Sequence, residues 1–140
     1  MYVVDTNVLV HAVNEAADEH SRAHDWLADA FMGHQTVALS WVAVLAFIRV
    51  STHPRVFSIP LTPLQAVDIA QAWFDQPNAT IIEPQDGHLA LVSDLLSGAG
   101  AAGDLAVDAH LAALALEHDA EVITFDRDFG RFPGVRWRAP

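Results

Sequence analysis

The sequence predicts an α/β fold built around a mostly parallel sheet of four or five strands. Short apolar runs alternate with helical patterns along the chain, as is typical of parallel strands joined by crossover helices. Of the 140 residues, 52% are hydrophobic, and no linker-like stretch or internal repeat divides them. A chain of this length can bury a sizeable core, so we expect one domain over residues 1–140.

The first half of the chain predicts two strands and four helices. Thr6 or Asn7 is expected to cap the first helix, and Ser40 to cap a strongly apolar third helix. The run Thr62-Pro63-Leu64-Gln65 has the spacing of a capping box with proline at the first helical position. The elements expected here are a strand over 2–4, helices over 6–13 and 20–32, a strand over 36–39, and helices over 41–51 and 63–75.

The second half predicts two or three strands and two helices. Glycine and alanine dominate the run SGAGAAG, which we interpret as a loop. The expected elements are a strand over 80–82, a helix over 88–96, the loop over 97–103, a helix over 105–118, a strand over 121–124 and a possible fifth strand over 135–137.

Composition restricts the kind of site. The formal charge is −11, and all seven cationic side chains are arginine, which argues against broad adhesion to nucleic acid or to anionic membranes. Cysteine is absent, so any metal must be held by oxygen or imidazole. No apolar run reaches membrane-spanning length and no signal sequence is apparent, so we expect a cytoplasmic protein without a membrane partner. Arg127, Arg131, Arg136 and Arg138 form either a positive patch near the C-terminus or a set of solvated side chains.

Two aspartates follow predicted strands directly. Asp5 comes after the strand over 2–4, and Asp126 comes two residues after the strand residue Thr124, with Asp128 close behind. Ligands of open parallel sheets bind beyond the carboxyl ends of the strands, which favours a binding site there. Helix capping is the alternative explanation for either aspartate alone.

A third aspartate lies inside an apolar helix. Asp108 is surrounded by Ala, Leu and Val in LAVDAHLAALALEH, and Asp104 lies four residues earlier on the same helical face. Burying an ionised carboxylate without a partner is costly, and grouped carboxylates raise one another's pKa. A divalent cation resolves both problems, and oxygen ligands favour Mg²⁺ or Mn²⁺. An arginine partner for these acids remains the alternative.

Eight histidines are scattered along the chain, without an HExxH motif. We expect most of them to be surface or capping residues. His110 lies two positions from Asp108 and therefore points away from it on a helix, so we interpret it as structural.

Several of these segments together resemble one family. DTN at residues 5–7, the aspartate in DAHLAALALEH and TFDRDF near the C-terminus look like the acidic motifs of PIN-domain ribonucleases. SWVAVLAFIRVSTHPRVF, DAHLAALALEHDAEVITFDRDFGRFPGVRW and the overall length are similar to VapC-type toxins of bacterial type II toxin–antitoxin pairs. The resemblance implies a three-layer α/β/α PIN-like sandwich, metal-dependent cleavage of RNA, a homodimer and inhibition by a cognate VapB-type antitoxin, in a heterotetramer or a larger assembly.

Carried over to this sequence, the resemblance assigns the acidic site to Asp5, Asp108 and Asp126, as catalytic residues and as metal ligands. Asn7 and Thr124 would give polar support. Many PIN nucleases have a further glutamate in the helix after the second strand, and this chain has Ala46 there. Asp104, Asp128 or Glu83 are candidates to replace that glutamate, and binding of a single metal ion is another possibility.

The functional hypothesis is therefore a Mg²⁺- or Mn²⁺-dependent endoribonuclease acting as a toxin. Arg49, Arg127 and Arg131 are candidate phosphate contacts, which would help an acidic protein to bind RNA. The alternative is a catalytically weakened PIN domain that acts as a protein-binding module, because the helices carry more large apolar side chains than a small core requires.

Overall fold

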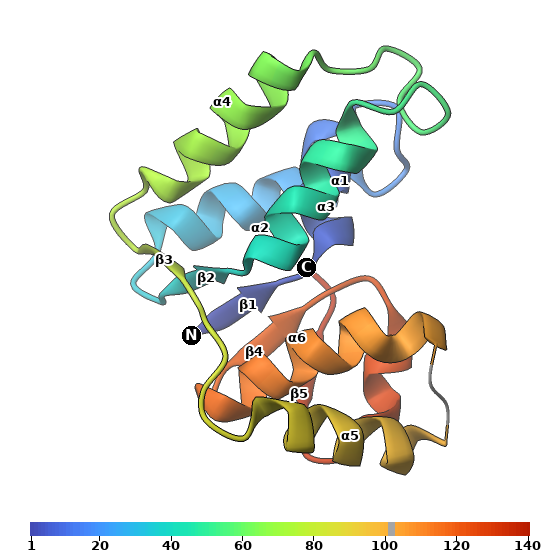
Figure 1. The fold of residues 1–140 in the computed structure, drawn as a ribbon. Helices are drawn as coiled ribbons and strands as arrows, with labels where there is room; N and C mark the ends of the chain where they lie inside the picture. The colour runs from blue at the N-terminus through green and yellow to red at the C-terminus, as the bar shows by residue number, and fades with distance from the viewer. Residues whose placement is uncertain (101–102) are drawn as a thin grey trace.

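The computed structural model describes residues 1–100 and 103–140, and its five strands form one parallel sheet. The strand order is β3-β2-β1-β4-β5, and every neighbouring pair is parallel (Figure 1). The predicted fold class is therefore confirmed. The elements are β1 (Tyr2–Val4), α1 (Thr6–Val13), α2 (His20–Met32), β2 (Val37–Leu39), α3 (Trp41–Ser51), α4 (Pro63–Phe74), β3 (Ala79–Ile81), α5 (His88–Ala99), the 3₁₀ turn η1 (Gly103–Leu105), α6 (Ala106–Glu117), β4 (Glu121–Ile123), the 3₁₀ turn η2 (Arg127–Arg131) and β5 (Arg136–Arg138).

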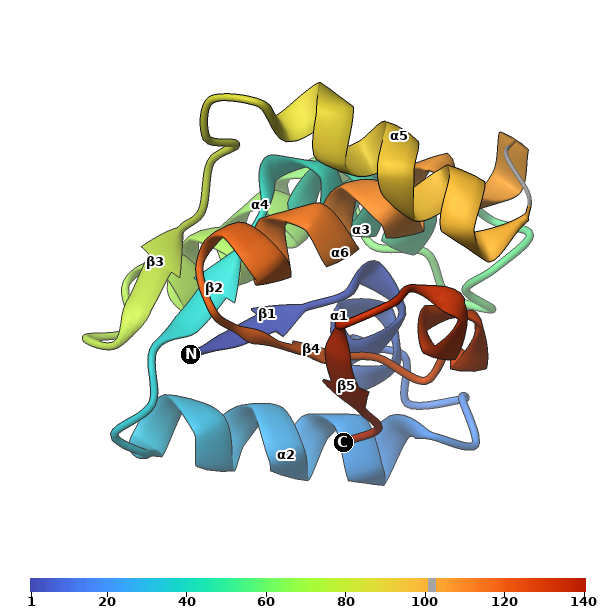
Figure 2. The same ribbon diagram turned by 90° about the horizontal axis from the view of Figure 1, so that it is seen from below.

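Helices cover both faces of the sheet and complete a three-layer sandwich. Consecutive strand residues point to opposite faces, so Val4 packs in the cluster formed with α1 to α4, whereas Val3 packs in the cluster formed with α5 and α6. Val122 and Ile123 of β4 divide between the same two clusters. Figure 1 shows α3 and α4 on one side of the strands and α5 on the other, and Figure 2 shows α2 and α5 on opposite sides of the sheet. Burial on both faces explains why the three inner strands β1, β2 and β4 each end in two apolar residues.

Local hydrogen bonds define where the helices begin. Ser40 caps α3 by accepting the backbone N–H of Ala43, and Thr62 and Gln65 form the predicted capping box of α4. The prediction for α1 was wrong by one residue, because Asp5 itself is the cap and accepts the backbone N–H of Thr6 at 2.6 Å. Capping and site formation are therefore not alternatives for Asp5, because its second carboxylate oxygen remains available for other contacts.

The predicted loop over 97–103 begins later than expected, because α5 continues to Ala99. The Ser97 hydroxyl donates to the Ser93 carbonyl, which keeps it within the helix. A Cβ atom on Gly98 would lie 3.3 Å from Cγ of Pro133, so glycine here permits close packing of α5 on the segment after η2. The helix then ends at Gly100, whose φ of 69° is readily adopted by glycine. Residues 101 and 102 of the expected loop lie outside the described residues.

The arginines near the C-terminus do not form a free positive patch. Arg136 pairs with Asp119 at 2.7 Å, and Arg138 pairs with Glu121 at 3.2 Å. Arg131 lies 3.7 Å from Asp128. Sequence reasoning missed the pairs of Arg136 and Arg138 because their partners lie on the turn before β4 and on β4, whereas Arg131 and Asp128 are three residues apart on η2. Within the described part of the chain, no helix combines the length and apolar character needed to cross a bilayer.

Candidate active site

The carboxyl ends of β1 and β4 bring Asp5 close to the segment that contains Asp126. The two strands are parallel neighbours in which Val4 is in register with Ile123, and the Asp5 backbone N–H donates to the Ile123 carbonyl at 3.0 Å. Asp5 is 6% exposed and follows the last residue of β1. Adjacent parallel strands thus place two predicted site segments side by side, as the strand pattern predicts.

Asn7 and Thr124 fix the Asp5 carboxylate. Thr124 donates its hydroxyl hydrogen to Asp5 Oδ2 at 2.7 Å, and Asn7 Nδ2 donates to the same oxygen at 2.7 Å. Asn7 Nδ2 also donates to Thr124 Oγ1 at 2.9 Å, which closes a triangle of side chains. Because Thr124 is fully buried, its hydroxyl group cannot bond to water instead, and it holds Asp5 in one orientation together with Asn7.

The same side chains also position the chain after β4. Asn7 Oδ1 accepts the backbone N–H of Phe125 at 3.1 Å, and Thr124 Oγ1 accepts that of Asp126 at 2.9 Å. Asp126 in turn caps η2 by accepting the backbone N–H of Asp128 at 2.8 Å. Asn7 and Thr124 are thus positioning residues for Asp126 as well as for Asp5.

Asp108 faces the same group of carboxylates from the first turn of α6. Its pKa is raised from 3.8 to about 6, first by burial and then by the negative charges of Asp5, Asp126 and Asp128. Burial also raises the pKa of Asp5, with a smaller contribution from Asp126, while the hydrogen bonds to Asp5 act in the opposite direction. Four acids from three parts of the chain therefore interact electrostatically at one edge of the sheet.

Three of these acids, Asp5, Asp108 and Asp126, lack a cationic partner among the described residues, whereas Asp128 lies 3.7 Å from Arg131. Within residues 1–100 and 103–140, the ion pairs involve neither Asp5, Asp108 nor Asp126. The arginine partner left open by the sequence is therefore not found for these three. Across the same ranges, no three histidine or acidic side chains form a ready-made metal-binding group. The donors themselves are hard carboxylate oxygens and they repel one another, and this chemistry fits Mg²⁺ or Mn²⁺.

Other predicted residues lie in different positions. The side chain of Asp104 lies outside what the structure describes. Glu83 follows β3, two strands away from β1 in the sheet, and is exposed. Ala46 is half-buried on α3 and supplies no carboxylate. Arg131 donates to the Ala99 carbonyl at 3.0 Å as well as facing Asp128, whereas Arg127 is exposed on η2.

Sequence reasoning missed a second buried polar cluster. His88 Nδ1 lies 3.0 Å from the Glu117 carboxylate, and His88 Nε2 lies 2.8 Å from His110 Nδ1. His88 is 8% exposed and is an exception to the expectation that most histidines are surface or capping residues, while the structural assignment of His110 agrees with this contact. The available signal was the spacing of His110 and Glu117, which are seven residues apart and share one face of α6.

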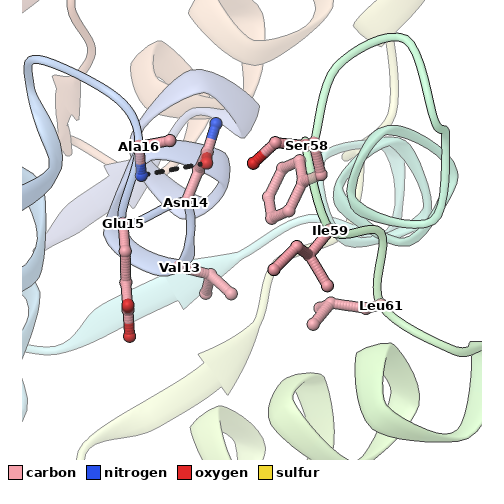
Figure 3. Close-up of a pocket in the computed structure, with 8 residues that line it drawn as sticks. Val13, Asn14, Glu15, Ala16, Ser58, Ile59 and Leu61 are labelled. Atoms are coloured by element: carbon pink, nitrogen blue, oxygen red, sulfur yellow. Dashed lines mark hydrogen bonds between the residues drawn. The ribbon is translucent and has the colours of Figure 1, made fainter.

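A hollow of the described surface does not contain the acids. It has a volume of about 420 Å³ and lies between the C-terminal end of α1 and the chain after α3, with Val13, Asn14, Ile59 and Leu61 in its wall (Figure 3). The eight residues of α1 span about 12 Å, and Asp5 lies at the opposite end. The chemistry of the edge carboxylates, and not the size of this hollow, therefore identifies the candidate site.

Comparison with known protein families identifies the family of this chain. A model of the PIN domain matches residues 2–135. The chain belongs to the PIN domain family. Ribonuclease VapC37 of Mycobacterium tuberculosis is 40% identical over 140 residues, which are 100% of this PIN domain and 97% of the relative. Ribonuclease VapC33 of the same organism is 36% identical over 140 residues, which are 100% of this chain and 98% of the relative.

Solved structures share the fold of this PIN domain at low sequence identity. VapC20 of Mycobacterium tuberculosis, described as a sarcin-ricin loop cleaving toxin, superposes with a TM-score of 0.71 at 18% identity, covering 97% of this chain and 99% of that one. VapBC2 from Rickettsia felis, bound to a DNA fragment from its promoter, gives a TM-score of 0.70 at 19% identity, covering 99% and 98%. The resemblance inferred from the sequence motifs is thus confirmed at the level of family and fold.

Proposed function

We propose that this PIN domain is a Mg²⁺- or Mn²⁺-dependent endoribonuclease and the toxin of a type II toxin–antitoxin pair. The observation that carries the proposal is the group of Asp5, Asp108 and Asp126, which gathers negative charge without a cationic partner among the described residues. Full-length relatives named as VapC ribonucleases support RNA as the substrate. The cytoplasm is the compartment in which such an enzyme would meet cellular RNA.

The three aspartates would hold the cation, directly or through water. A bound Mg²⁺ or Mn²⁺ lowers the pKa of coordinated water and stabilises negative charge on phosphate oxygens. Asn7 and Thr124 would keep Asp5 oriented during the reaction, because both donate to the same carboxylate oxygen. Hydrolysis adds water across the P–O3′ bond, so the products carry a 5′-phosphate and a 3′-hydroxyl.

Basic side chains would bind other phosphates of the RNA strand. Arg127 extends from η2, directly after Asp126, and is exposed. Arg131 lies on the same turn, and Arg49 lies on α3. These three arginines give a protein with a charge of −11 a local means of binding RNA. Asp128 on η2 is an additional acid for the cation, and Asp104, which precedes α6, stays a candidate on the sequence alone.

Two protein partners are part of the proposal. Several solved relatives are complexes of a VapC-type toxin with an antitoxin, including VapBC from Salmonella typhimurium bound to DNA, which supports a VapB-type antitoxin as partner. Trp41 and Leu45 of α3 are large apolar side chains that are 47% and 59% exposed, which supports association with a second chain. We expect a homodimer, and a heterotetramer or larger assembly with the antitoxin. Light scattering should give twice the 15.2 kDa monomer mass for the protein alone.

Cleavage of purified RNA tests the catalytic proposal. The protein should cut RNA with Mg²⁺ or Mn²⁺ and stop cutting when a chelator is added. Asp5→Asn and Asp108→Asn should each lose at least about 100-fold in rate, since each removes a charged ligand. Asp68→Asn is the matched control, because Asp68 is an exposed aspartate on α4.

The alternative is a PIN domain that keeps antitoxin binding without hydrolysis. Ala46 favours it, because position 46 offers no carboxylate to the cation. If the folded protein binds its antitoxin but leaves RNA intact with either metal, the alternative replaces the nuclease proposal. Mapping of RNA ends after expression in cells would identify the substrate.

A further inference from the structure

A second hollow, away from the acids, combines an apolar floor with a basic rim. It has a volume of about 340 Å³, lies at the C-terminal end of α3, and is lined by Arg49, Val50, His53, Arg55 and Val56. The valines and the aliphatic stems of the arginines form most of its surface. We call this group the α3 hollow.

The arginines of the α3 hollow differ from most others in the chain. Four of the seven arginines lie within ion-pair distance of a carboxylate: Arg22, Arg131, Arg136 and Arg138. Among residues 1–100 and 103–140, the ion pairs include neither Arg49 nor Arg55, and both side chains are exposed. Two free guanidinium groups beside one hollow provide several donors for an anion.

The turn that carries Arg55 is held in one conformation. The His53 carbonyl accepts the backbone N–H groups of Val56 at 3.1 Å and Phe57 at 3.2 Å. Phe57 is 4% exposed and anchors the turn in the core, while Pro54 restricts the backbone between His53 and Arg55. The backbone positions of Arg49 and Arg55 are therefore set before any ligand arrives, which reduces the part of the entropy cost of binding that comes from the backbone.

His53 is also oriented by its own turn. The Arg55 backbone N–H donates to His53 Nδ1 at 3.1 Å, so Nδ1 carries a lone pair and the neutral ring carries its proton on Nε2. His53 is exposed, and Nε2 is therefore a donor directed to a ligand or to solvent. The ring also offers a flat face against which a planar group can stack.

The backbone carbonyls at the C-terminal end of α3 do not compete for the guanidinium donors. The Ile48 carbonyl accepts the Thr52 hydroxyl at 2.8 Å, the Val50 carbonyl accepts the His53 backbone N–H at 3.1 Å, and the Ser51 carbonyl accepts that of Leu61 at 3.0 Å. Because the last carbonyls of the helix are satisfied internally, the guanidinium groups remain available for a ligand.

We propose that the α3 hollow binds one nucleotide of the RNA strand, a few nucleotides away from the scissile phosphate. Arg49 and Arg55 bind the phosphate, and the base stacks over the apolar floor against a guanidinium or imidazole plane. This subsite rests on the proposed function, because it binds the substrate of that reaction. α3 begins after β2, which is the neighbour of β1 in the sheet (Figure 1). The eleven residues of α3 span about 16 Å, and the hollow lies at the C-terminal end of the helix.

A nucleotide fits the α3 hollow better than an acidic peptide segment does. Carboxylates of a peptide would satisfy the arginines, but they would leave the apolar floor and the planar groups without a matching partner. A nucleotide supplies an anion and an aromatic face in one unit. The protein carries a net charge of −11 and as a whole repels anions. The basic rim attracts an anion locally despite this repulsion, as expected of a specific site.

Binding of a short single-stranded RNA tests the subsite without cleavage. The protein carries Asp5→Asn and is kept in chelator, and fluorescence anisotropy follows a labelled octanucleotide at several salt concentrations. Arg49→Ala and Arg55→Ala should each weaken binding about tenfold and reduce the salt slope by about 0.7. The matched control is Arg136→Ala, which removes an arginine paired with Asp119 and should change binding less than twofold.

Two further ligands separate the possible occupants. An abasic octamer of the same length should bind about tenfold more weakly than RNA, since stacking contributes to binding. Equal binding of both would overturn the nucleotide assignment in favour of a phosphate contact alone. A deca-glutamate peptide should compete poorly, and competition as strong as that of RNA would assign the α3 hollow to an acidic protein segment instead.

The subsite and the nuclease proposal can fail separately. If Arg49→Ala and Arg55→Ala bind and cleave RNA like the parent while the parent cleaves with metal, the subsite is wrong and the nuclease proposal stands. If the parent never cleaves but RNA binding depends on both arginines, the nuclease proposal is wrong and the α3 hollow is an RNA site. Unchanged melting temperatures for both exposed substitutions exclude misfolding as the cause.

Discussion

The acids at the two ends of α6 differ in their electrostatic surroundings. Near its start, Asp108 interacts with Asp5 and Asp126, and no arginine or histidine of the described residues pairs with any of them. At its end, Glu117 contacts His88, which in turn contacts His110. The first cluster gathers like charges, whereas the second pairs a carboxylate with imidazoles.

The difference separates a site that requires a ligand from a cluster that stabilises the fold. Glu117 also accepts the Gln85 backbone N–H at 3.3 Å, so its carboxylate joins α5 and its preceding turn to α6. A buried pair of this kind is satisfied by the chain itself, whereas the repulsion around Asp108 is relieved only by a proton or a cation from solution. Burial of a carboxylate alone therefore does not indicate function.

The largest expected effect is a separation of activity from stability between Asp108 and Glu117. Asp108→Asn should reduce metal-dependent RNA cleavage at least about 100-fold and leave the metal-free protein at least as stable, because it removes a repelled charge. Glu117→Gln should keep cleavage within about threefold and lower stability. Rate assays and urea unfolding of both variants check this. Equal loss of cleavage in both would show that the two ends act as one unit.

Truncation of Glu117 should produce the next largest effect. Glu117→Ala leaves buried His88 without its partner and should lower the free energy of unfolding by about 3 kcal/mol. Glu121→Ala breaks the more exposed pair with Arg138 and should cost below about 1 kcal/mol. Urea denaturation at neutral pH measures both. Similar costs would mean that the buried cluster does not join α5 to α6.

Thr124→Val tests how the acidic site around Asp5 is positioned. The substitution keeps the volume but removes the hydroxyl that donates to Asp5 and accepts from Asn7 and from the Asp126 backbone. It should cost about 1–2 kcal/mol in unfolding free energy and reduce cleavage about tenfold. The conservative Thr124→Ser should restore most of the rate. Failure of serine to do so would indicate that the methyl group, and not the hydroxyl, positions Asp5.

Asp108 and His110 should make stability depend on pH with opposite signs. This is the smallest of the expected effects, on the order of 1 kcal/mol. The pKa of Asp108 is about 6 in the folded protein and 3.8 ordinarily, so in chelator the folded state binds more protons and stability falls as pH rises through this window. Burial lowers the pKa of His110 below 6.5, so its contribution is present above pH 6.5 and is lost on acidification.

Two substitutions separate these pH effects. Asp108→Asn should remove the decline between about pH 4 and 6, and His110→Gln should remove the loss below about 6.5. Thermal melts across this range, in chelator, measure both. A decline that persists in Asp108→Asn would assign it to another acid.

Much of the candidate site could be predicted from local patterns in the sequence. Asp5 and Asp126 were predictable because the ends of parallel strands meet at one edge, and Asp108 because a carboxylate is out of place in an apolar helix. The fold class followed from the alternation of strands and helices. These inferences need only neighbouring residues and the rules of a parallel sheet.

Contacts between distant segments were not predictable in the same way. His88 and Glu117 are 29 residues apart, and nothing near His88 in the sequence indicates its burial. The pairing of Arg136 with Asp119 likewise depends on how β5 lies beside β4. The α3 hollow escaped notice because it forms only when the turn after the helix folds back beside Arg49.

The cap of α1 has a consequence for how this protein can change over generations. The Asp5 carboxylate caps α1 by accepting the backbone N–H of Thr6, and the same carboxylate belongs to the acidic site. Cells can survive expression of the proposed toxin when a mutation replaces Asp5. A replacement that cannot cap α1 would remove the proposed activity and destabilise the fold in one step. Asparagine keeps the cap, so Asp5→Asn should remove the proposed activity and leave the protein folded.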